Sequence, residues 1–75
     1  MITIKQIQDN LIDALKHSYI TQTELAEKVG VKQSQISCYL HGKKLPSLDT
    51  FANICAVLDL DPTEILAIDK YSKNT

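Results

Sequence analysis

Apolar residues recur along this chain at intervals of three and four, which is the period of a helix with one buried face. Between positions 22 and 40 two such faces follow each other: Leu25, Ala26 and Val29, then Ile36 and Leu40. Gly30 lies between them, and glycine adopts the left-handed backbone that ends a helix in a sharp turn. Ala26 is small where the two helices would cross. The pattern therefore predicts two short helices joined by a tight turn, the spacing of a helix-turn-helix.

A longer amphipathic helix is predicted before this pair. Thr3 and Gln6 have the spacing of a capping box, and Ile2 and Ile7 have that of a hydrophobic staple. The predicted buried stripe consists of Ile4, Ile7, Leu11, Ala14 and Leu15. The side chains expected to face water are those of Lys5, Gln8, Asp9, Asp13 and Lys16.

Three more helix starts have the same signature. Thr21 with Glu24 predicts a capping box, and Ser47 follows a proline as the expected N-cap of a fourth helix. Asp61, with Pro62 and Glu64 behind it, starts a short fifth helix. The predicted apolar face of the fourth helix consists of Leu48, Phe51, Ile54, Cys55 and Leu58. The sequence therefore predicts an all-α, five-helix domain over residues 1–69, followed by a polar, frayed tail at 70–75.

Length and composition restrict the function classes. Seventy-five residues suffice for one small domain, and no signal peptide or apolar run of membrane length is present. We therefore expect a cytoplasmic chain with no membrane partner, and we interpret Cys38 and Cys55 as reduced core or half-buried residues. Cys38 and His41 stand three residues apart, but without paired ligand spacings a zinc site is disfavoured. No cofactor is expected, and no phosphate loop or nucleophile motif suggests an enzyme.

Charge is distributed unevenly, although the net charge is only −1. Positions 28–48 contain four lysines and no acid, and positions 49–69 contain five acids and no lysine. The basic block coincides with the predicted helix-turn-helix, which favours a nucleic-acid contact over a merely solvated face. The chain has no arginine, so the bidentate arginine–guanine contact is excluded.

Hydrogen-bonding side chains occupy the rest of the second helix of the pair. They are Lys32, Gln33, Ser34, Gln35 and Ser37. Such residues read base edges or hold phosphates, while a solvated helix face is the simpler alternative. The combination of this face with the turn and the lysines favours the first interpretation.

Over positions 7–66 the chain resembles the λ-repressor/Cro-like (XRE-type) helix-turn-helix family. The segments that carry the resemblance are Ile20-Thr21-Gln22, Glu24-Leu25-Ala26, Val29-Gly30-Val31, Gln33-Ser34, Ile36-Ser37, Gly42-Lys43-Lys44, Pro46-Ser47-Leu48 and 61–66. Many members of the family have arginine where Leu15 stands and glutamate where Leu40 stands, so the two leucines are consistent with apolar packing in place of an ion pair between helices. The resemblance implies a DNA-binding domain, whereas the family's biological roles are diverse.

Site residues follow from the resemblance. Gln22, with Thr23, corresponds to the family's phosphate contact, although a solvent-exposed helix start is the alternative. Gln33 and Ser34 take the leading base-reading positions, and the amide of Gln33 matches adenine. The predicted base-reading set is Lys32, Gln33, Ser34, Ser37 and Cys38, and the predicted phosphate set is Gln22, Thr23, His41, Lys43 and Lys44.

The resemblance also implies an assembly. The predicted terminal helix has more apolar residues than so short a helix needs to bury, namely Ile65, Leu66 and Ile68. We interpret them as a dimer surface, with core burial as the alternative. The expected function is a transcriptional regulator, most simply a repressor, that binds a palindromic operator in double-stranded DNA as a homodimer. Activation through a polymerase contact is open to the same domain. The rival hypothesis is an antitoxin whose main partner is a toxin chain.

Overall fold

The computed structural model describes residues 1–68 and consists there of five helices. They are α1 (Ile4–Lys16), α2 (Gln22–Val29), α3 (Gln33–Leu40), α4 (Leu48–Leu58) and α5 (Pro62–Ile65). The predicted all-α fold is confirmed, with α2 and α3 as the helix-turn-helix pair. The predicted tail at 70–75 and residue 69 lie outside the described residues.

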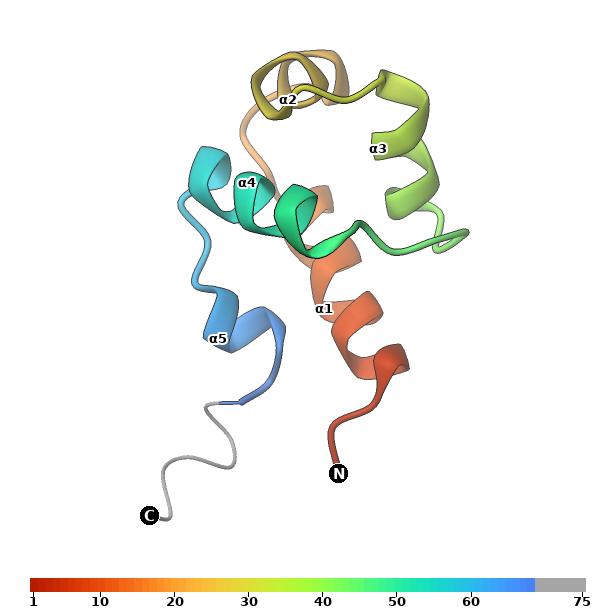
Figure 1. Cartoon of the computed structure of the whole chain (residues 1–75), viewed down its shortest axis with the longest axis vertical. Helices are drawn as coiled ribbons and strands as arrows, with labels where there is room; N and C mark the ends of the chain where they lie inside the picture. Colours follow the sequence, from red (N-terminus) through yellow and green to blue (C-terminus); the bar gives the residue numbers. More distant parts are fainter. Residues whose placement is uncertain (69–75) are drawn as a thin grey trace.

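The helices are arranged so that α3 lies at one side of the molecule (Figure 1). The longest helix, α1, runs from the N-terminal end towards α2, and it packs against α3 and α5. In turn, α2 packs against both α3 and α4. The two helices that hold α3 in place are therefore α1 and α2.

The core joins the first four helices through one fully buried residue each. Leu11, Leu25, Ile36 and Ile54 have at most 2% of their surface exposed. Around them pack Leu15, Ala26, Tyr39, Leu58 and Ile65, and Leu40 lies against the same cluster. Leu15 and Leu40, which stand where many family members have an ion pair, therefore contribute apolar packing to a small core.

Two residues predicted to be buried are exposed. Ile4 is 64% exposed and Leu48 is 86% exposed. Each is the first residue of its helix. They lie instead on the walls of an open apolar groove of about 240 Å³, to which Leu66 also contributes. The periodic pattern correctly placed both residues in helices, but it could not show that the core does not extend to the first residue of each helix.

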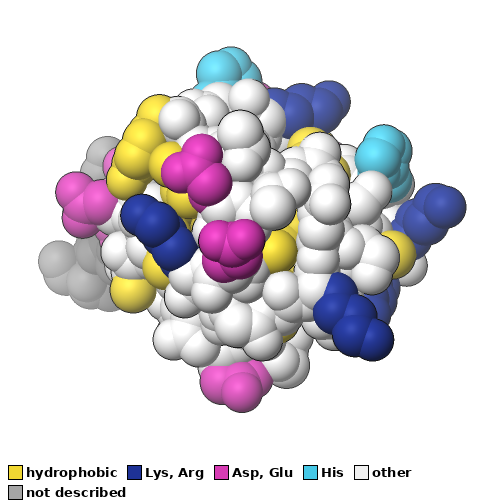
Figure 2. Space-filling model, turned by 90° about the horizontal axis from the view of Figure 1, so that it is seen from above, with side chains coloured by type: hydrophobic (Ala, Val, Ile, Leu, Met, Phe, Trp, Pro, Cys, Tyr) yellow, Lys and Arg dark blue, Asp and Glu magenta, His cyan; other side chains and the backbone are white. Residues whose placement is uncertain are grey.

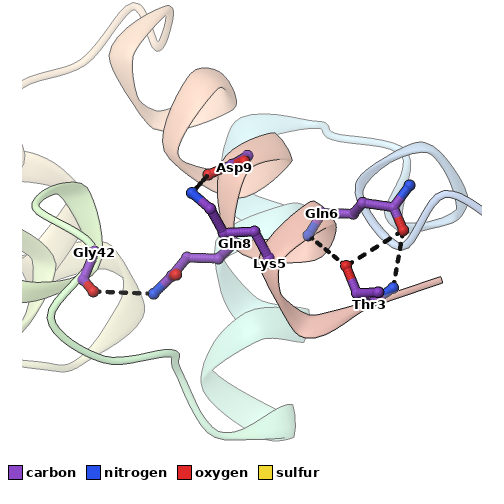
Figure 3. A network of polar contacts seen from close by, with 6 residues as sticks. All are labelled: Thr3, Lys5, Gln6, Gln8, Asp9 and Gly42. Carbon is purple, nitrogen blue, oxygen red and sulfur yellow. Dashed lines mark hydrogen bonds and ion pairs between the residues drawn. The ribbon is translucent and has the colours of Figure 1, made fainter.

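Gln8 was expected to face water, and this prediction is wrong. Its side chain is half-buried, and Nε2 donates a hydrogen bond of 3.1 Å to the carbonyl oxygen of Gly42, 34 residues further along the chain (Figure 3). This contact ties α1 to the loop after α3. Periodicity could not predict it, because the partner is distant in sequence.

The helix starts match their predictions to different degrees. The Thr3–Gln6 box is complete, since Thr3 Oγ1 accepts from the backbone of Gln6 and Gln6 Oε1 accepts from the backbone of Thr3 (Figure 3). At α2 only half of the predicted capping box forms. The side chain of Thr21 accepts from Glu24 N–H at 3.1 Å, while the Glu24 carboxylate accepts from the Thr21 hydroxyl at 3.4 Å. At α5 the N-cap Asp61 accepts from Thr63 N–H at 2.9 Å.

Ser47 has the backbone of an N-cap, but its side chain caps nothing. Its hydroxyl donates to Asp49 Oδ1 at 2.6 Å instead. This hydrogen bond, followed by one from the backbone of Thr50, lowers the pKa of Asp49 below its ordinary value. Ser47 is therefore the N-cap by backbone conformation, but the side-chain cap expected there is absent.

Within residues 1–68 no helix is long and apolar enough to cross a membrane.

Candidate nucleic-acid interface

The turn between α2 and α3 depends on one backbone conformation. Gly30 has a φ of 87°, and a Cβ added there would meet no atom within 4 Å. The requirement for glycine is therefore conformational, since space is free. The N–H groups of Gly30 and Val31 both donate to the carbonyl of Ala26, at 2.8 and 3.0 Å. These bonds end α2 and direct the chain into α3.

At the start of α3 only one of the two hydrogen bonds of a capping box forms. The backbone N–H of Lys32 donates to Gln35 Oε1 at 3.1 Å, while the ammonium group of Lys32 cannot accept a hydrogen bond in return. The side chain of Gln35 therefore turns back towards the backbone of Lys32 and is half-buried. The side chains of Lys32, Gln33 and Ser34 stay exposed at this end of the helix. Three of the predicted base-reading residues thus form the outward end of α3.

The other end of α3 is fixed by two backbone bonds. Gly42 has a φ of 70°, its N–H donates to Tyr39 O at 3.2 Å, and the N–H of Lys43 donates to Cys38 O at 2.9 Å. This is a Schellman arrangement, which satisfies the last carbonyls of a helix. Gln8 holds the Gly42 carbonyl from α1 (Figure 3). The loop with His41, Lys43 and Lys44 is thereby anchored at its centre.

The residues predicted to contact DNA fall on adjoining elements, and none of them is buried. Ser37 and Cys38 are half-buried on α3, whereas His41, Lys43 and Lys44 are exposed on the loop that follows it. Gln22 is half-buried and Thr23 is exposed in the first turn of α2, which packs against α3. Gln8, the anchor of the loop, is the residue that sequence reasoning missed.

Basic groups gather on the side of the molecule that carries α3. In Figure 2 lysine and histidine side chains follow the right-hand edge, and the acidic side chains shown on this face lie away from it. Within residues 1–68 the close contacts between basic and acidic side chains are Lys5–Asp9 at 3.0 Å on α1 and His17–Asp13 at 3.4 Å at the end of α1, and the second is an ion pair only when the ring of His17 is protonated. The lysines of α3 and its loop are therefore not neutralised by described acids. Such a surface attracts an anionic polymer.

The cysteines are free and contribute to packing. Cys55 is 5% exposed, and burial, with Asp61 as a smaller cause, raises the pKa of its thiol. Cys38 is half-buried, as expected. Within the described residues, no three histidine, cysteine or acidic side chains come together as metal ligands would.

The C-terminal apolar residues differ in exposure. Ile65 is 7% exposed and belongs to the core of this chain. Leu66 is half-buried on the wall of the apolar groove, and Ile68 is 44% exposed. A partner could therefore reach Leu66 and Ile68 much better than Ile65.

Comparison with known proteins bears on this geometry at the level of the family. No curated protein and no solved structure matches the chain. A sequence model of the helix-turn-helix family matches residues 11–65, which include both helices of the pair, the loop after α3, and α4. This range covers more than half of the chain and agrees with the resemblance found over positions 7–66. The chain therefore belongs to the XRE-type, λ-repressor/Cro-like family of DNA-binding helix-turn-helix domains.

Proposed function

We propose that the protein is a transcriptional regulator that inserts α3 into the major groove of double-stranded DNA. The observation that carries this proposal is the acid-free face formed by α3 and its loop. The major groove of DNA admits an α-helix, and each base pair presents a distinct pattern of hydrogen-bond donors and acceptors there. Lys32, Gln33 and Ser34 would enter first, and Ser37 and Cys38 would follow one turn later.

Phosphate contacts would flank the reading helix on both sides. Gln22 and Thr23 lie in the first turn of α2, where backbone N–H groups and the helix dipole favour an anion. His41, Lys43 and Lys44 lie on the loop that Gln8 anchors. Contacts of this kind set the register of the protein on the duplex and carry no base identity.

The acting form would be a homodimer on a palindromic operator. Two recognition helices about 34 Å apart would read successive major grooves on one face of the duplex. Ile68 is exposed, and Leu66 joins it to the apolar groove whose walls include Ile4 and Leu48. The residues that line this groove carry no charge, so a second copy could cover it without burying an ion.

Repression would follow from occlusion of polymerase at the operator. A polymerase contact leading to activation, or a toxin chain covering the apolar groove, is the alternative use of the same domain. The toxin alternative predicts that a second, different chain copurifies with this one and that the isolated protein remains a monomer.

Selection of bound sequences from a random duplex pool tests the proposal. We expect enrichment of a two-fold symmetric motif whose half-sites are spaced by about one helical turn. No enrichment at low salt would overturn the regulator function. Enrichment of an asymmetric motif would support sequence-specific DNA binding but contradict the proposed homodimer.

A further inference from the structure

The loop between α3 and α4, residues 41–47, is fixed by local hydrogen bonds only where it begins. Its first backbone N–H groups donate to the last carbonyls of α3, and the ring of His41 turns back to the same turn, with Nδ1 2.8 Å from the carbonyl oxygen of Ser37. The N–H groups of Lys44 and Leu45 donate to no backbone carbonyl of residues 1–68. The second half of the loop must therefore be held by other parts of the chain.

Two contacts with other elements flank the exposed lysines of this loop. On one side the carbonyl oxygen of Gly42 accepts a hydrogen bond of 3.1 Å from Gln8 Nε2 on α1 (Figure 3). On the other side Leu45 is half-buried and packs against the core. Lys43 and Lys44 lie between these two points, and so short a segment held at both ends has few conformations left. The two contacts therefore decide where the lysines are presented.

The face of α1 that carries Gln8 lies directly behind the loop. Gln8 and Ile12 are one helical turn apart, and a Cβ added to Gly42 would lie 3.6 Å from Ile12 Cδ1 and 3.9 Å from Gln8 Nε2. A carbonyl oxygen can only accept, so its partner must be a donor. The amide nitrogen of Gln8 is that donor, in a part-buried position where water competes less for the bond. In the described part of the chain no other hydrogen bond joins α1 to residues 41–47.

We infer that Gln8 is a positioning residue for DNA binding, which acts from α1 by holding the loop lysines in one arrangement. The inference rests on the proposed function, because it requires the basic face to be the face that binds DNA. Without the bond Gly42 is released from α1, and the loop samples arrangements from which the duplex must select the matching one. Loss of this one neutral hydrogen bond should therefore weaken DNA binding by about two- to tenfold, while α3 itself is unchanged.

Gln8→Met tests the inference, because it keeps the length of the side chain and removes the donor. The variant should bind the duplex selected from the random pool about two- to tenfold more weakly. The same factor should apply to each single-base variant of that duplex, because the loop lies outside the reading helix. Anisotropy titration measures the affinity, and circular dichroism measures the helix content.

Gln6→Met is the matched control on the same helix. The side chain of Gln6 accepts from the backbone of Thr3 at 2.9 Å, within the capping box of α1, and makes no hydrogen bond to the loop (Figure 3). The same substitution there should lower the stability of the fold without changing the affinity for DNA. If Gln8→Met loses helix content, Gln8→Asn takes its place, because it keeps the amide on a side chain one methylene too short to reach Gly42.

A double-mutant cycle at low salt separates positioning from a general structural role. In a chain with both Lys43→Ala and Lys44→Ala, Gln8→Met should cost little further affinity, because the lysines it positions are gone. Equal losses with and without the lysines, a changed base preference, or an unchanged affinity of Gln8→Met would overturn the inference while leaving DNA binding in place. If the wild-type protein bound no duplex at any salt concentration, the proposed function would fall and the inference with it.

Discussion

Two glutamines, Gln22 and Gln33, have the same side chain and opposite expected roles. Gln33 is exposed at the first position of α3, and Gln22 is half-buried at the first position of α2. An amide can match the donor–acceptor pair of adenine in the groove, or it can donate to a phosphate. The element that carries each glutamine, rather than its chemistry, decides between these roles.

Substitution by alanine should separate the two glutamines. Gln33→Ala should cost about 1–3 kcal/mol at one symmetric position of the site and flatten the base preference there. Gln22→Ala should weaken binding to all sequences nearly equally, because a phosphate contact does not distinguish bases. Binding to a panel of single-base operator variants measures both. A uniform loss in Gln33→Ala would move the reading role to Ser34, Ser37 and Cys38.

Lys43 and Lys44 are exposed and should act through charge. Replacing either one by alanine should reduce the slope of log K against log salt by roughly one unit, because each lysine displaces a condensed counterion from DNA. Anisotropy titrations over a range of salt concentrations measure the slope. Lys5→Ala, which removes a lysine already paired with Asp9, is the control and should leave the slope unchanged.

At the scale of elements, the position of α3 depends on a few buried contacts. Ile36 is 1% exposed and lies on the inner face of this eight-residue helix. A helix so short is marginal in isolation, so tertiary packing must supply its stability.

Ile36→Ala should destabilise the fold by about 2–5 kcal/mol, since it removes buried methyl groups and leaves a cavity. Chemical denaturation measures this loss. Ser34→Ala, on the exposed face of the same helix, should have little effect on stability. Equal losses in the two variants would contradict the assignment of inner and outer faces.

Tyr39 on α3 should make the stability of the fold depend on pH in the alkaline range. Burial first, and then the nearby Cys38 and Asp49, raise its pKa above the ordinary value of 10.0. The folded protein therefore favours the neutral phenol of Tyr39. The resulting contribution to the free energy of unfolding is fully present below the pKa of Tyr39 in the unfolded chain, and it is lost as pH rises through the pKa of Tyr39 in the folded protein. The melting temperature should fall as pH is raised above about 10, and it should fall less in Tyr39→Phe. Parallel curves for the two proteins would exclude Tyr39 as the cause.

Sequence reasoning succeeded where local chemistry determines structure. Gly30, the capping residues and the 3.6-residue period were sufficient for the helix-turn-helix and for the first residues of α1, α2, α4 and α5. It failed where the answer depends on distant parts of the chain, as for Gln8, whose partner is Gly42, and for Leu48, which no helix covers. The left-handed Asp59, which ends α4 with a φ of 54°, stands where glycine is the usual signal.

For the candidate site, sequence could supply residues but not hydrogen-bond directions. Gln35 belongs to the polar face of α3 by spacing, yet its side chain accepts from the backbone of Lys32. The contact of His41 with Ser37 likewise depends on side-chain rotation at the end of the helix, which no periodic pattern determines.

At the scale of the whole molecule, the proposed dimer depends on the apolar surface at the C-terminal end. Ile68→Glu should give a monomer that remains helical, because a buried charge at the interface would be unpaired. Tyr19→Glu is a matched control, as Tyr19 is 78% exposed but contacts the end of α4 through Val57. Sedimentation with circular dichroism measures assembly and fold together. Unfolding of the Ile68 variant would assign this residue to the core, and an unchanged dimer would move the interface elsewhere.

The central claim is that α3 reads bases in the major groove, and a double-mutant cycle tests it most directly. One change is Gln33→Ala, and the other replaces the N7 of the contacted adenine by carbon, which alters only the major-groove edge. Each change alone should weaken binding, and the two together should cost little more than one, because they remove the same hydrogen bond. Strictly additive losses, or no loss from the altered adenine at any operator position, would contradict major-groove reading by Gln33.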